Sequence, residues 1–279
     1  MSAIAGIDHT LIAAADLEAA RATWARLGFT CTPRGRHIGW GTANHCIMFP
    51  DDYIELLGIV DASQFVNGLD TTLATRGEGL LGLAFAGDVD AAFTELGPGL
   101  VEPPKDLARI LELPDGDVTP RFRLLHPTGP GTFPALPAFT TQHLTPELLR
   151  RSDWLEHANG ARGLEGVTVV VEDPARLTEG YAARFGQNAV FQGRGRLDVR
   201  VGPHTLRFLA PERFAKRYPA IALPAALPVP VVMTVLVADL GATAETLRSR
   251  GVPTRDVQGT RLVVPPAEAT GVVLEFAVS

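Results

Sequence analysis

The fold of this chain is decided by two short segments, GIDHTL at residues 6–11 and DYIELL at residues 52–57. Each is a β-compatible run that contains one side chain able to ligate a metal, His9 in the first and Glu55 in the second. A helical stretch and further strand-like segments lie between them, so the pair brackets a compact βαβββ unit. An imidazole and a carboxylate on neighbouring strands of a curved sheet are a common beginning of a divalent-metal site. The alternative is a half-buried histidine and a glutamate at a sheet rim, because polar strand residues usually face water.

The unit recurs along the chain, and such internal repeats define a fold. In each copy a strand-like run leads into an aspartate that begins a predicted helix. Aspartate is a good N-cap, since its carboxylate accepts hydrogen bonds from the free N–H groups of the first turn. The four aspartates are Asp16, Asp88, Asp173 and Asp239. The residues that take the place of His9 in the other three copies are Leu81, Gly166 and Val232.

Each predicted helix is followed by shorter strand candidates and a last apolar strand. We expect these last strands at residues 53–59, 121–125, 205–209 and 272–278. Aligned by their apolar flanks, they place Arg123, Arg207 and Glu275 at the position of Glu55. The alternative is a chance agreement between generic strand–helix patterns. The sequence therefore predicts an α+β fold of four βαβββ modules, paired into two domains with curved mixed sheets.

The length of 279 residues suits two domains of two modules each. Residues 127–137 are rich in proline and glycine, which excludes a regular helix or a central strand there. Residues 145–156 then read as a helix, with Thr145 as the N-cap and Pro146 in the first turn. We expect a first domain at residues 1–126, a connector at 127–162 and a second domain at 163–279.

Paired βαβββ modules with histidine on the first strand and glutamate on the last resemble the vicinal oxygen chelate superfamily, which includes glyoxalase I and the extradiol dioxygenases. A narrower resemblance, to the glyoxalase-like domain family, lies in four stretches. These are residues 6–29, 35–49 (GRHIGWGTANHCIMF), 52–59 and 157–174 (HANGARGLEGVTVVVEDP). The resemblance implies two glyoxalase/dioxygenase-like domains, with a small-molecule site in a cleft of the first domain.

The resemblance also implies a metal site, because in this superfamily the ion lies between two modules that supply ligands from their first and last strands. His9 and Glu55 match that pattern as catalytic and metal-binding residues. Leu81 and Arg123 stand at the two matching places of the second module, and neither is a metal ligand. The implied ion is a divalent metal (Fe, Mn, Zn or Ni), with one protein ligand too few.

Three arrangements remain open for the missing ligand. His37 or His45 can reach the cleft from a neighbouring strand, or His157 can reach it from the connector. Otherwise the site has no cofactor, and His9 and Glu55 act as an acid–base pair in which the carboxylate orients the imidazole.

Arg123 is the most informative departure from the superfamily pattern. A guanidinium cannot ligate a cation, but it can hold a carboxylate or phosphate through two hydrogen bonds. This predicts that Arg123 binds an anionic substrate across the cleft. The alternative is an exposed strand arginine that pairs with Glu112 or Asp117.

Two further groups of residues are candidates for substrate binding. In the segment WGTAN, Trp40 can form a pocket wall, while Thr42 and Asn44 can orient a substrate oxygen. In the segment HANG, His157 and Asn159 are candidates through the family resemblance. The alternative readings are a tight strand connection around a core tryptophan and an ordinary turn.

The net charge of −6 argues against a nucleic-acid partner, because no basic stripe is available to neutralise phosphates. The long apolar run near residues 221–239 is interrupted by three prolines, so we expect no membrane partner. The N-terminus lacks a secretion signal, which predicts a cytoplasmic protein. The pattern also allows a homodimer.

Together these features predict a glyoxalase-like enzyme of the lyase, isomerase or dioxygenase type. It would act on an oxygen-rich or anionic small molecule in the first domain, with or without a metal. The alternative is a protein that binds and sequesters a small molecule without converting it, like the drug-resistance branch of the superfamily.

Overall fold

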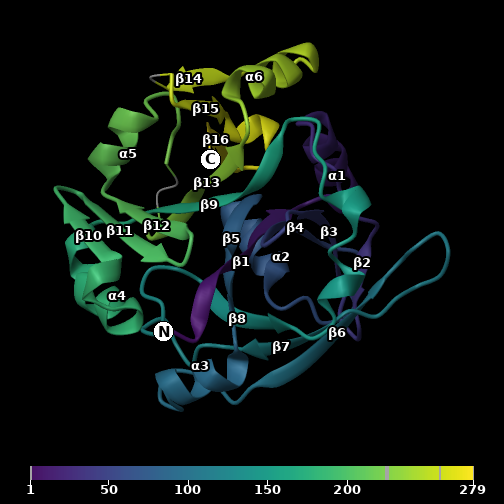
Figure 1. Ribbon diagram of the computed structural model, residues 1–279, viewed down its shortest axis with the longest axis horizontal. Helices are drawn as coiled ribbons and strands as arrows, with labels where there is room; N and C mark the ends of the chain where they lie inside the picture. The colour runs from purple at the N-terminus through teal and green to yellow at the C-terminus, as the bar shows by residue number, and fades with distance from the viewer. Residues whose placement is uncertain (1, 224–225, 258, 279) are drawn as a thin grey trace.

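The computed structural model describes residues 2–223, 226–257 and 259–278, and within them two β units lie side by side (Figure 1). The first unit contains three helices, α1 (Leu17–Arg26), α2 (Leu69–Arg76) and α3 (Val89–Leu96). Its strands are β1 (Ile4–Ala14), β2 (Gly35–His37), β3 (Thr42–Met48), β4 (Tyr53–Ile59), β5 (Gly79–Gly87), β6 (Lys105–Leu111), β7 (Arg121–Leu125) and β8 (Ala138–His143). They close into a barrel in the order β1-β4-β3-β2-β6-β7-β8-β5.

The second unit is an open sheet of eight strands. Its strands are β9 (Ala161–Val170), β10 (Val190–Gly193), β11 (Arg196–Val201), β12 (His204–Leu209), β13 (Val229–Val237), β14 (Arg255–Val257), β15 (Arg261–Val264) and β16 (Val273–Val278). Their order is β10-β11-β12-β9-β13-β16-β15-β14. Its helices are α4 (Thr178–Phe185), α5 (Pro211–Arg217) and α6 (Leu240–Ser249). The predicted α+β class with two curved mixed sheets is confirmed.

The repeat predicted from the sequence is present. Each of the four aspartates accepts hydrogen bonds from backbone N–H groups in the first turn after it, as an N-cap does. The first and last strands of each module pair in parallel: β1 with β4, β5 with β8, β9 with β12 and β13 with β16. Three of the four last strands lie where we expected them.

The last strand of the second module was predicted wrongly. It is β8, which pairs in parallel with β5, whereas residues 121–125 form β7 between β6 and β8. The proline- and glycine-rich segment 127–137 is therefore a loop inside the first domain, and the barrel continues to His143. The predicted domain boundary at residue 126 cuts through this barrel, so it is wrong.

The single helix predicted at residues 145–156 is also wrong, because two 3-10 turns at residues 146–148 and 152–154 take its place. The Thr145 hydroxyl accepts from the backbone N–H of Arg121 and caps no helix. The Arg150 side chain donates to the backbone carbonyls of residues 49, 51 and 52, which ties the segment to the barrel. These contacts outweigh the local helix signal.

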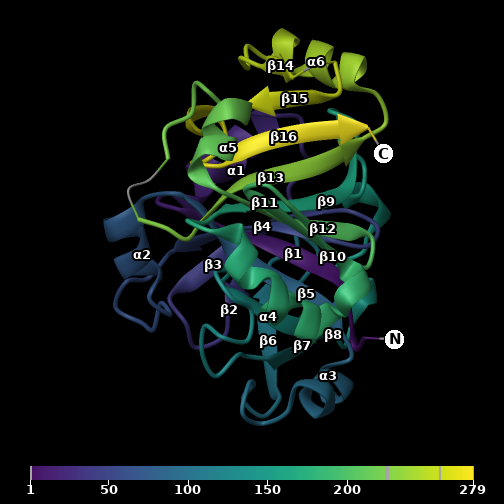
Figure 2. The ribbon, with the colours of Figure 1, turned by 90° about the vertical axis from the view of Figure 1, so that its left-hand side faces the viewer.

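The two units share one hydrophobic core. Figure 2 shows β16, β13 and β9 of the open sheet lying above β4, β1 and β5 of the barrel. Trp24 of α1 is fully buried in this core and donates from Nε1 to Thr270 Oγ1 across the interface, at 3.1 Å. Asp52 accepts from the Leu164 N–H and from His204 in the same region. Among the described residues, no helix has the length and apolar character that crossing a bilayer requires.

Gly82 on β5 permits the close approach of the chain that leads into β8. A Cβ atom at this position would clash with the backbone carbonyl oxygen of Pro137. We therefore expect Gly82→Ala to lower the free energy of unfolding by about 1–3 kcal/mol. Gly99→Ala is the matched control, because a Cβ there meets no atom within 4 Å. Equal stability of the two variants in urea unfolding would contradict this account of the barrel.

Candidate active site

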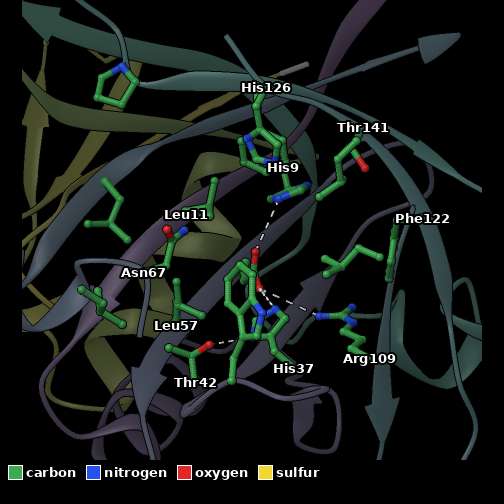
Figure 3. A pocket seen from close by; sticks show the side chains of 18 of the residues that line it. His9, Leu11, His37, Thr42, Leu57, Asn67, Arg109, Phe122, His126 and Thr141 are labelled. Atoms are coloured by element: carbon green, nitrogen blue, oxygen red, sulfur yellow. Dashed lines mark hydrogen bonds and ion pairs between the residues drawn. The ribbon is translucent and has the colours of Figure 1, made fainter. Parts of the chain in front are cut away.

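The interior of the barrel contains a cavity of about 350 Å³, shown in Figure 3. Five of the residues proposed from the sequence line it: His9, His37, Trp40, Thr42 and Glu55. Most of the remaining wall is apolar, formed by leucine and phenylalanine side chains from the strands and α2 and by Val66 and Pro137 from loops. The cavity therefore combines a few polar groups with a mainly hydrophobic surface, as small-molecule sites commonly do.

His9 is held in a fixed orientation on β1. Its Nδ1 lies 2.7 Å from Asp8 Oδ1, and its ring stacks on Tyr53 with the ring centroids 4.4 Å apart. Its Nε2 lies 3.4 Å from Glu55 Oε2. The β1–β5 pairing is irregular between Ile7 and His9, as at a β-bulge. This irregularity lets the consecutive side chains of Asp8 and His9 both lie in the interior. The Asp8 carboxylate therefore directs Nε2 of His9 towards Glu55.

Asp8 is buried between two imidazoles. Besides the His9 contact, its Oδ1 lies 3.1 Å from His143 Nε2. Burial alone would raise the pKa of the Asp8 carboxyl, but hydrogen bonds from His143 and His9 outweigh it and hold the pKa well below its usual range. Asp8 is therefore a permanent carboxylate behind His9. Asp8 was not among the residues proposed from the sequence, although its place beside His9 was a usable signal.

Glu55 on β4 is the centre of the polar cluster and is only 6% exposed. It accepts a hydrogen bond from the Asn44 amide, and its Oε1 lies 4.0 Å from both His37 Nε2 and Arg109 Nη1. Burial raises the pKa of Glu55, but the neighbouring charges of His9, Arg109 and His37 and the Asn44 amide lower it overall. Asn44, expected to contact substrate, instead orients Glu55.

His37 and Trp40 form the wall beside Glu55. Nδ1 of His37 lies 2.9 Å from Thr42 Oγ1, and the ring centroids of His37 and Trp40 are 5.6 Å apart. Trp40 also contacts Phe65 edge to face, which links this wall to the loop before α2. Burial lowers the pKa of His37, and the charge of Arg109 adds to this effect while Glu55 opposes it.

Two basic residues of the cavity, Arg109 and His126, were not among those proposed from the sequence. Arg109 on β6 lies in the segment KDLARIL, where it shares the apolar face of the strand with Leu107; a charged residue in such an alternation was the available signal. His126 lies in the loop after β7, and its ring stacks on Phe139 at 5.3 Å between centroids. No signal in the sequence identified His126.

Arg123 lies outside the cavity, so the expectation that it faces the cleft is wrong. Its guanidinium contacts Asp90 Oδ1 at 2.8 Å and Asp106 Oδ1 at 2.9 Å on the outer surface of the barrel. The cause is the mistaken last strand: on β7 the neighbours Phe122 and Leu124 face inwards, and Arg123 alternates outwards.

His157 and Asn159 also lie away from the cavity, so the expectation that they contact a substrate there is wrong. His157 accepts from the Thr30 N–H and donates to the Met48 carbonyl, each at 3.0 Å. Asn159 donates to the Leu27 carbonyl and accepts from the Ala161 N–H. Both side chains satisfy backbone groups where the connector crosses the first unit. His45 likewise contacts Thr32 and Glu18 on the α1 side.

The donor set in the cavity does not fit the divalent metal that the family resemblance implies. Among the residues that the structure describes, no three His, Cys, Asp or Glu side chains are arranged to share an ion. The cavity-facing residues of β8 are Phe139 and Thr141, so the second module supplies no strong ligand from its last strand. The Arg109 guanidinium lies where it would repel a cation bound to Glu55.

Asp8 gives a pH-dependent test of the cluster. Its pKa is depressed in the folded state, so its contribution to stability is present above about pH 4 and is lost as the pH falls further. We expect Asp8→Asn to lower the free energy of unfolding by about 2 kcal/mol at pH 6, with the difference shrinking towards pH 2. Asp115→Asn, at an exposed loop residue, should change stability by less than about 0.5 kcal/mol throughout. A constant effect of Asp8→Asn between pH 6 and pH 2 in urea unfolding would contradict the assignment.

Comparisons with solved structures establish the fold. A protein from Staphylococcus aureus described as hypothetical superimposes with a TM-score of 0.67 at 12% identity, covering 98% of this chain and 99% of that one. A mutant of 4-hydroxymandelate synthase from Streptomyces coelicolor gives a TM-score of 0.63 at 14% identity, covering 98% and 92%. A fusion protein of a xylose isomerase-like TIM barrel and 4-hydroxyphenylpyruvate dioxygenase gives 0.59 at 14% identity, covering 99% of this chain and 48% of that one.

Comparisons of sequence establish the family. No curated protein matches the chain significantly. The sequence model of a family described as "Glyoxalase-like domain" matches residues 7–185, which cover nearly all of the barrel and continue through β9 and α4 of the second unit. The chain therefore belongs to the glyoxalase-like domain family of the vicinal oxygen chelate superfamily.

Proposed function

We propose that the first barrel is an enzyme of the lyase or isomerase type, which moves a proton to or from a small carbonyl compound without a metal. The observation that carries this proposal is the arrangement of His9, which is buried, fixed from behind by Asp8, and directed by Nε2 towards Glu55 at the cavity wall. An imidazole in this setting is a suitable general acid or base.

His9 is the group that carries the proton. With Nδ1–H donating to Asp8, Nε2 carries the lone pair at the cavity wall, 3.4 Å from Glu55, and it accepts a proton from a substrate carbon next to a carbonyl group. The resulting imidazolium lies between two carboxylates, those of Asp8 and Glu55, and both stabilise it. Because the pKa of Glu55 is lowered, Glu55 remains ionised and supplies this stabilisation throughout the neutral pH range.

His37 is suited to stabilise the negative charge that develops on the substrate oxygen. The lowered pKa of His37 keeps its ring neutral. When the Thr42 hydroxyl donates to Nδ1, the proton of the neutral ring lies on Nε2, which is on the side of Glu55. A preorganised donor in an apolar cavity stabilises an enolate more strongly than water does, since the local dielectric constant is low. The apolar walls also exclude water from the intermediate.

The second candidate function is binding without conversion. The predominantly apolar wall favours it, because such a surface binds small molecules whether or not chemistry follows. The two functions differ in the role of His9. Conversion requires His9 to transfer a proton, whereas sequestration requires only that its side chain form part of the cavity wall.

Exchange of carbon-bound hydrogen with D₂O, followed by ¹H NMR, distinguishes the two functions. We expect the parent to catalyse exchange next to the carbonyl group in compounds such as 4-phenylbutan-2-one and 4-phenyl-2-oxobutanoate. His9→Gln should reduce the exchange rate by about 10²–10⁴-fold, the usual size of an acid–base contribution. His45→Gln is the matched control, because His45 is a buried histidine outside the cavity.

Three results would contradict the proposal. Exchange that persists in His9→Gln would remove His9 as the proton carrier. Exchange that is abolished by a chelator and restored by a divalent ion would require a metal. Ligand binding without exchange in the parent would favour sequestration.

A further inference from the structure

Arg109 has fewer hydrogen bonds than a buried guanidinium requires. It is only 3% exposed, and its Nη1 donates to Cys46 Sγ at 3.3 Å. A thiol sulfur is a weak acceptor. Among the described residues, no acceptor lies within hydrogen-bond distance of its Nε. A buried guanidinium is normally paired with a carboxylate through two parallel hydrogen bonds, because leaving its charge unpaired is costly.

The nearest carboxylate does not satisfy Arg109. Glu55 Oε1 lies 4.0 Å from Nη1, beyond hydrogen-bond distance. Glu55 is held in that place by the Asn44 amide on Oε1 and by His9 near Oε2. Arg109 therefore lines the cavity with a charged guanidinium that, among the residues the structure describes, has no carboxylate within hydrogen-bond distance.

The surroundings of Arg109 define the rest of the ligand. The ring of Phe122 covers the guanidinium, with the Arg109 Cζ atom 5.4 Å from the ring centroid. Beyond it the wall is formed by Leu107, Leu124 and Phe139. A volume of about 350 Å³ lies at the lower end of small-ligand sites. The cavity thus offers one anion-binding end and an apolar interior of limited size.

We propose that the cavity takes a small monocarboxylic acid with an apolar body, and that Arg109 binds its carboxylate through two hydrogen bonds. This inference rests on the proposed function for the identity of the cavity, and it names the substrate class for that site. The carboxylate lies at the Arg109 end, and the apolar chain or ring extends between Leu107, Leu124 and Phe139 towards His9. Arg109 thereby takes the role that the sequence suggested for Arg123.

Isothermal titration with matched acids and amides tests this subsite. The probes are 3-phenylpropanoate and hexanoate, each compared with its primary amide, which has nearly the same shape but no charge. We expect the parent to bind each acid at least about tenfold more tightly than the amide, since hydrogen bonds between charged groups are the stronger kind. Arg109→Gln should abolish that preference and leave amide binding within about threefold.

Two further variants control for folding and for general charge. Arg109→Lys keeps the positive charge but loses the two-point geometry, so we expect an intermediate preference for the acid. Arg123→Gln removes a surface arginine that is paired with Asp90 and Asp106, and we expect the parent's preference to persist. Circular dichroism and thermal melting identify any variant that fails to fold. If Arg109→Gln is unfolded, the acid–amide preference of Arg109→Lys is compared with that of the parent instead.

The outcomes separate this inference from the proposed function. Equal binding of acid and amide by the parent overturns the carboxylate subsite, as does the absence of acid binding at millimolar concentration. A preference for the acid that stays at the parent's level in Arg109→Gln also overturns it, as does a preference at the parent's level in Arg109→Lys if Arg109→Gln does not fold. His9→Gln should retain the preference while losing hydrogen exchange, so failure of exchange alone affects the proposed function and leaves the subsite standing.

Discussion

The parallel pairing of β1 with β4 is the constraint on which the rest of the site depends. In this register His9 lies opposite Tyr53 and Leu11 lies opposite Glu55. Parallel neighbours in register present their side chains to the same face of a sheet, so the imidazole and the carboxylate both face the barrel interior. A shift of one residue would turn one of them to the outside. The N-cap at Asp16 and the packing of α1 on β3 and β4 help to fix this register.

The buried charges of the barrel are arranged for function more than for stability. The carboxylates of Asp8 and Glu55 both lie against His9, and Glu55 also faces Arg109, in a mainly apolar interior. Burying such groups costs free energy that pairing repays only in part. In the second sheet, Glu275 stands at the position equivalent to Glu55, but its environment differs. Glu275 is fully buried and accepts from Arg217 and Tyr218 at the end of α5, so this carboxylate is neutralised within the fold.

Much of the architecture followed from the sequence because its signals were local. Each N-cap aspartate and three of the four last strands could be identified from a few neighbouring residues. The second module failed because β8 carries the polar run Thr140-Thr141-Gln142 and follows a proline- and glycine-rich loop, so it does not look like a last apolar strand. Because residues 121–125 were predicted to be the last strand, Arg123 was wrongly expected in the cavity, and Arg109 was not proposed. Pairings between distant residues, such as Asp8 with His143 or Asn44 with Glu55, depend on barrel closure and have no local signal.

The central claim is that His9 and Glu55 interact inside the barrel, and a double-mutant cycle on stability tests it most directly. The free energies of unfolding of the parent, His9→Gln, Glu55→Gln and the double variant would be measured in urea at pH 6. Groups in contact give a coupling free energy of about 0.5–3 kcal/mol, and we expect a value of at least about 1 kcal/mol here. Additivity of the two substitutions within about 0.3 kcal/mol would show that the side chains do not interact, and it would contradict the account.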